Sequence, residues 1–110
     1  MEKIRGDQGA LIVKAARKAI VDYFRTGTVS IADLPDGLDF ECGVFVTLKK
    51  HSARGEKLRG CIGYPEPIYR LSRGLSKSSV SAAVSDPRFS PVQETELEGL
   101  IVEVTLLSKP

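Results

Sequence analysis

The stretch Lys57–Pro67, KLRGCIGYPEP, decides how the chain folds, because it reads as a strand that passes two glycines and ends at a proline-framed turn before a helix. It is also the segment in which a thiol, a guanidinium and glycine backbone open to close approach come together. Cys61 follows Arg59 and Gly60 directly, and Gly63 comes two residues later. We therefore place the candidate site in this stretch.

The sequence before this stretch predicts a helix and a strand. Apolar residues at helical spacing predict a helix that Asp7 caps and Gly27 closes. Residues 30–34 predict a short helical turn that stops before a proline. Alternating apolar residues over Phe40–Lys49 predict a strand with one buried face, and the polar residues 51–56 predict the loop of a hairpin.

The sequence after the stretch predicts a second helix and a last strand. Apolar and small residues from Ile68 to Ala83 indicate a helix packed on a sheet, and Asp86 before Pro87 marks its exit. Alternation over Gly99–Leu107 predicts a strand. A helix between two strands of one sheet favours a parallel, right-handed crossover. The predicted fold is a single α+β domain over residues 1–110, an antiparallel hairpin plus a crossover strand in a small sheet with two helices packed on it.

The alternation within the central strand predicts where its thiol lies. One face of the strand carries Arg59, Cys61 and Gly63. A register that sets Leu58 opposite Val46 keeps the apolar face continuous and places the thiol outside the core, beside a cation and near a helix entrance. Both neighbours favour the thiolate. We expect Cys61 to be a catalytic nucleophile and Arg59 to orient an anionic group.

Several residues of the motif also have structural interpretations. A single cysteine in a strand more often only packs in the core. If Cys61 is catalytic, His51 is the one histidine available as its base. Gly60 and Gly63 either permit a bulge or tight turn, or expose N–H groups to a ligand oxyanion. Tyr64, at the end of the strand, is a further candidate binding residue.

Asp86 and Arg88 form a second candidate binding pair. Their charges either reach back to Arg59 and Cys61 as a rim of the site, or only stabilise their own turn, since Asp before Pro is an ordinary turn signal. The sequence leaves both alternatives open.

Composition limits the classes of function. The net charge of +2 is too small to imply a nucleic-acid partner. Two cysteines and one histidine are too few for a structural metal site, Cys42 is assigned to the core, and no motif names a cofactor. The polar side of the first helix resembles a phosphate-binding face, but the pattern favours a solvated surface; its basic residues are Lys14, Arg17, Lys18 and Arg25.

The sequence carries no sign of a membrane segment. No run approaches the roughly 20 consecutive apolar residues that a spanning helix needs, and the first residues lack an apolar signal core. We expect no membrane association and a cytoplasmic location.

Three motifs together resemble those of the AMMECR domain family: LRGCIG at 58–63, AAVSDPRF at 82–89 and IVEVTLLSKP at 101–110. The resemblance spans nearly the whole chain and implies an α/β domain of two unequal parts, with no assigned biochemical activity. It also implies that family members continue for about as many residues again, a size that still fits one domain, with a histidine-containing segment in the remaining half.

These features lead to two hypotheses about function. The first is a cytosolic site for a small-molecule ligand or for modification chemistry around the Arg-Gly-Cys-Ile-Gly motif. The alternative is a regulatory or binding module that holds a protein or nucleic-acid partner without catalysis. Because the last strand is apolar on both faces, we also expect a second copy or the missing C-terminal half to cover it, unless residues 86–98 fold over its second face.

Overall fold

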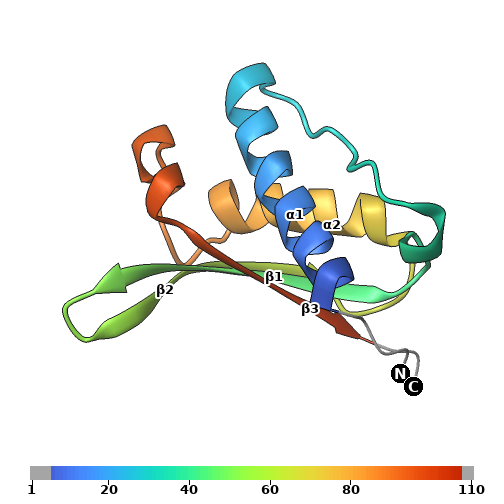
Figure 1. The fold of residues 1–110 in the computed structure, drawn as a ribbon. Coiled ribbons are helices and arrows are strands. Elements are labelled where there is room, and N and C mark those ends of the chain that lie inside the picture. Colours follow the sequence, from blue (N-terminus) through green and yellow to red (C-terminus); the bar gives the residue numbers. More distant parts are fainter. Residues whose placement is uncertain (1–5, 108–110) are drawn as a thin grey trace.

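A three-stranded sheet carries two long helices on one face within residues 6–107, the part of the chain that this computed structural model describes (Figure 1). The predicted α+β class and the order helix, hairpin, helix, strand are confirmed. The elements in chain order are α1 (Gly6–Thr26), the 3₁₀ turn η1 (Asp36–Leu38), β1 (Gly43–Ser52), β2 (Gly55–Tyr64), α2 (Leu71–Val84), the 3₁₀ turn η2 (Glu94–Gly99) and β3 (Ile101–Leu107).

Helix α1 follows the prediction closely. It buries Ile12, Ala16 and Ile20 along one side, as their spacing requires. Gly27 ends it, since this residue has a φ of +77° and its N–H donates to the Tyr23 carbonyl at 2.7 Å. The side chain of Asp7, the predicted cap, lies outside the described residues.

The connection to the sheet differs from the prediction. Residues 30–34 form no helical turn; instead the Ala32 N–H donates to Ser76 Oγ of α2 at 2.8 Å. The helical turn comes after Pro35, in η1, where Pro35 has an extended ψ of 146°. A proline disfavours helix in the residue before it and tolerates a helix after it, which explains the displacement.

The hairpin is tighter than predicted. Strands β1 and β2 extend to a two-residue turn before Gly55, which has a φ of +104°, so His51 lies in a strand and not in a loop. Val46 therefore pairs with Ile62. The predicted pairing of Val46 with Leu58 is wrong by four residues, and because four is an even number the shift leaves Cys61 on the predicted face.

A β-bulge interrupts this pairing at Arg59. Leu48 pairs with Gly60 and Lys49 with Leu58, so Arg59 has no partner on β1. The extra residue reverses the alternation of side chains on its far side. Leu58 consequently shares a face with Lys49 and is 36% exposed, which contradicts its predicted place in the core.

The sheet has the order β2-β1-β3, and both outer strands are antiparallel to β1. Strands β2 and β3 therefore run parallel to each other with β1 between them, and α2 makes the predicted crossover. Helix α2 begins only at Leu71, so Ile68, predicted on its buried side, precedes the helix and is 61% exposed.

Both helices and the segment 86–99 lie on the same side of the sheet (Figure 1). The alternative that residues 86–98 cover the second face is wrong, because Val92 is buried in the shared core and donates its N–H to the Ala83 carbonyl at 2.8 Å. Among the described residues, neither the helices nor this segment covers the opposite face. We call it the open face; Phe45, Thr47, Cys61 and Glu103 belong to it.

Candidate functional site

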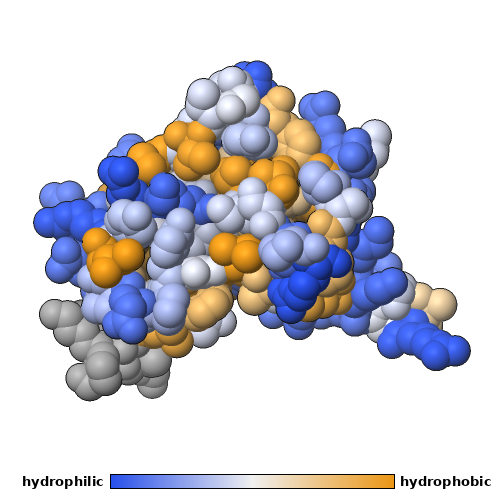
Figure 2. All heavy atoms as spheres, turned by 180° about the vertical axis from the view of Figure 1, so that it is seen from behind, coloured by the Kyte–Doolittle hydropathy of each residue, from blue (hydrophilic) through white to orange (hydrophobic). Residues whose placement is uncertain are grey.

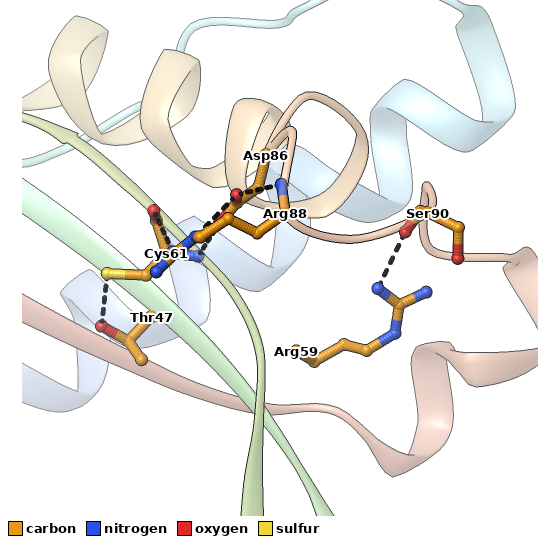
Figure 3. Close-up of polar contacts among 6 residues, drawn as sticks. All are labelled: Thr47, Arg59, Cys61, Asp86, Arg88 and Ser90. Atoms are coloured by element: carbon orange, nitrogen blue, oxygen red, sulfur yellow. Dashed lines mark hydrogen bonds and ion pairs between the residues drawn. The ribbon is translucent and has the colours of Figure 1, made fainter.

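The thiol of Cys61 lies on the open face in a row that crosses the sheet. Thr47 pairs with Cys61 on one side and with Glu103 on the other. Cys61 Sγ and Thr47 Oγ1 are 3.3 Å apart, a hydrogen bond in which either group can be the donor (Figure 3). Cys61 is half-buried, and Thr47 holds its thiol in position.

Asp86 and Arg88 bind the backbone of Cys61 from outside the sheet (Figure 3). Asp86 Oδ2 accepts the Cys61 N–H at 3.0 Å, and Arg88 Nη2 donates to the Cys61 carbonyl at 3.4 Å. Because β2 is an edge strand, these two backbone groups would otherwise face solvent. The pair therefore occupies the position of a further strand and closes the edge at the thiol.

The same pair also builds its own turn. Asp86 Oδ1 accepts the Arg88 N–H at 3.1 Å, and Arg88 Nη2 lies 2.7 Å from Asp86 Oδ2. This hydrogen bond from Arg88 is the main reason why the pKa of Asp86 is lowered, and the Cys61 N–H lowers it further; the pKa of Arg88 is raised in return. The pair thus does both things that the sequence left open. It stabilises its own turn, and it reaches back to Cys61, although not to Arg59.

Arg59 points away from the thiol (Figure 3). Its guanidinium forms a two-pronged ion pair with Glu96, at 2.9 and 3.1 Å, and donates to the Ser90 carbonyl at 2.8 Å and to the Pro91 carbonyl at 3.3 Å. Hydrogen bonds from Arg59 and from a backbone N–H lower the pKa of Glu96 to about 2. Because of the bulge, the Arg59 side chain binds the segment 90–96. The cationic side chain at Cys61 is that of Arg88.

Gly60 and Gly63 allow close packing. A Cβ on Gly60 would collide with the Ala82 carbonyl of α2, and one on Gly63 would meet the Val44 carbonyl and the Phe45 ring. The bulge lies at the neighbouring residue and the turn comes after Tyr64, so neither glycine forms them. Binding of an oxyanion by their N–H groups stays a prediction.

The remaining candidates lie apart from the thiol. The ring of Tyr64 packs edge-on against Tyr69, with centroids 5.1 Å apart. His51 pairs with Glu56, four residues along β1 from the row of Cys61, which is about 13 Å. His51 is therefore not placed to act as a base for this thiol.

Cys42 has the predicted structural role. It is 6% exposed and belongs to the core cluster. Burial, with a contribution from the Asp39 carboxylate, raises the pKa of its thiol. The two cysteines thus differ in burial, since Cys42 is buried and Cys61 is half-buried.

The basic side of α1 is not a uniform cationic surface. Arg17 donates to the Leu97 carbonyl at 3.0 Å and to the Leu100 carbonyl, fixing the start of β3. Lys18 forms an ion pair with Asp22 at 2.7 Å. Across residues 6–107, moreover, neither helix combines the length and apolar content that crossing a bilayer demands.

Thr47 is the residue that sequence reasoning missed. The predicted register, with Leu58 opposite Val46, would set Gly43 opposite Cys61, whereas the structure sets Thr47 there. Its partnership with the thiol depends on the tight turn of the hairpin, for which Gly55 is the one local signal.

The fold and this site define an α+β protein in which a cysteine-bearing edge strand is closed by an Asp-Pro-Arg-Phe turn. The model of the AMMECR1 family matches residues 13–110, and the chain belongs to this family.

Archaeal proteins of the family are similar over the whole chain. Protein PF1979 of Pyrococcus furiosus is 43% identical over 113 residues, covering 100% of this chain and 54% of its own length. A protein of Thermococcus gammatolerans is 46% identical, again over 100% of this chain and 55% of its own length. The crystal structure of the uncharacterized protein PH0010 of Pyrococcus horikoshii superimposes with a TM-score of 0.87 at 41% identity, covering 97% of this chain and 54% of that chain. The chain thus spans about half the length of these relatives.

Proposed function

We propose that the open face around Cys61 binds a small molecule and that the Cys61 thiol is its reactive group. The observation that carries this proposal is the position of Cys61, a half-buried residue on an uncovered sheet face whose thiol is hydrogen-bonded to Thr47 at 3.3 Å. The ion pair of Asp86 and Arg88 supports it, since it holds the Cys61 backbone in place.

The neighbours of Cys61 can hold the sulfur and a ligand in place. The Thr47 hydroxyl can donate a hydrogen bond to the sulfur. The Arg88 side chain is 57% exposed and lies at the same strand position. Arg88 therefore takes the part predicted for Arg59, that of orienting an anionic group of the ligand.

Alkylation with iodoacetamide at neutral pH tests this proposal. We expect Cys61 to react faster than a model thiol with a pKa of about 8.5, and a Thr47→Val variant to react more slowly. Cys42 serves as an internal control, because burial keeps it unreactive in the folded protein. A rate for Cys61 no faster than that of the model thiol would refute the role of nucleophile.

A binding or regulatory module without catalysis is the second candidate. This candidate is favoured because charged groups of the motifs already have partners inside the protein. Arg59 forms an ion pair with Glu96, and Asp86 forms one with Arg88. In this case the motif builds a rigid edge for a partner and Cys61 only packs. This candidate predicts that Cys61 is alkylated slowly and that Thr47→Val does not change the rate.

A further inference from the structure

An open groove of about 420 Å³ lies between the hairpin and the segment 89–96. The hairpin end projects beyond the helices (Figure 1), and the projecting arm is mostly hydrophilic (Figure 2). The groove is lined by Lys50, Lys57, Leu58, Arg59, Phe89, Ser90 and Glu96. Its two lysines lie apart from the row of Cys61, because Lys50 and Lys57 belong to the opposite, helix-bearing face of the sheet.

The groove has an excess of positive charge. Glu96 is the one acidic residue in its lining, against Lys50, Lys57 and Arg59. Both Glu96 oxygens are taken by Arg59, and Lys50 approaches the same carboxylate at 3.6 Å. Lys57 has no ion pair within the described part of the chain and is exposed.

The two lysines face each other directly. Lys50 and Lys57 are cross-strand partners in the hairpin, an arrangement in which like charges repel. The carboxylates around this end are engaged elsewhere: Glu103 lies 3.2 Å from Lys49, and Glu56 lies 3.9 Å from it. Glu96 offsets part of this repulsion through Lys50, but Arg59 shares its carboxylate, and an anion between the lysines would remove the rest.

We propose that this groove binds a small organic phosphate, with the phosphate between Lys50 and Lys57. A phosphate dianion matches the excess charge of the lining, and lysine ammonium groups are effective point charges for phosphate. Phe89 and Leu58 are the apolar members of the lining and provide a surface for the organic part. The inference stands apart from the proposal for Cys61, and its test does not involve the thiol.

Titration with inorganic phosphate and with phenyl phosphate, followed by amide NMR at constant ionic strength, tests the proposal. We expect saturable shifts at the groove residues and about threefold tighter binding of phenyl phosphate, from partial burial of its ring. Lys57→Gln should weaken both ligands about three- to fivefold, as expected for one exposed ion pair. Arg54→Gln is the matched control, because it removes the same charge from the hairpin outside the groove lining. Absence of saturable shifts, or equal weakening by both variants, would overturn the proposal.

The stability of the same variant gives an independent measurement. In chloride buffer, Lys57→Gln should raise the Tm by about 1 to 2 °C, because it removes the repulsion from Lys50. Phosphate should then raise the Tm of the wild type but not that of the variant. A lower Tm for Lys57→Gln in chloride would contradict the repulsion on which the proposal rests.

Discussion

The ion pair between Arg59 and Glu96 makes the stability of this protein depend on pH in a way that one substitution can isolate. Hydrogen bonds from Arg59 and from the Gln93 N–H lower the pKa of Glu96 from an ordinary 4.5 to about 2. A pKa difference of about 2.5 corresponds to about 3 kcal/mol of stabilisation at neutral pH. The Glu96 side chain is 22% exposed, so screening by solvent reduces our expectation to about 2 kcal/mol.

Because the folded pKa lies below the unfolded one, this stabilisation is complete above pH 4.5 and is lost as the pH falls through about 2. Glu96→Gln should therefore lower the free energy of unfolding by about 2 kcal/mol at pH 7, and by roughly two-fifths of that at pH 3. Urea unfolding followed by circular dichroism measures the difference in stability between the wild type and the variant at each pH. The contributions of other acidic groups cancel in this difference.

Glu98→Gln is the control for this experiment, since Glu98 lies in the same turn η2, is exposed and has no ion pair within residues 8–107. It should change the stability by less than about 0.5 kcal/mol. An effect of Glu96→Gln that is equal at pH 7 and pH 3 would refute the reasoning, because the charge of the carboxylate would then contribute nothing.

Three further predictions concern packing and association. Gly60→Ala should lower the free energy of unfolding by about 2 to 3 kcal/mol, because a Cβ there collides with the Ala82 carbonyl. The control Gly37→Ala should not lower the free energy of unfolding in this way, because its Cβ would meet open space, and equal effects of the two variants would exclude the collision. Ser78→Ala should be neutral or stabilise by up to about 1 kcal/mol in the same urea assay, because the buried Ser78 hydroxyl has no partner among the described residues; a clear loss of stability would reveal a partner. The outer edge of β3 pairs with no described strand, so sedimentation should show association that grows with concentration; a monomer at every concentration would contradict this.

The site was predictable only in part. The motif marked Cys61, and the signal of Asp before Pro marked Asp86, and the structure brings these two residues together. The role of Arg59 was not predictable, because a bulge inserts one residue and turns the guanidinium toward Glu96, 37 residues further along the chain. Nothing in the local sequence distinguishes a bulged strand from a regular one here.

The sequence by itself determined the elements and their order. Helical spacing and Gly27 define α1, alternation defines the three strands, and Asp86-Pro87 ends α2, because these signals act through backbone conformation and burial within a few residues. The tertiary structure alone decided the register of β1 with β2, the pairing of β3 with β1 and the partner of the thiol. These depend on contacts between distant segments, such as Gly60 against Ala82, and several registers satisfy the same apolar alternation. Only the packing of α2 and segment 86–99 on the sheet selects one of them.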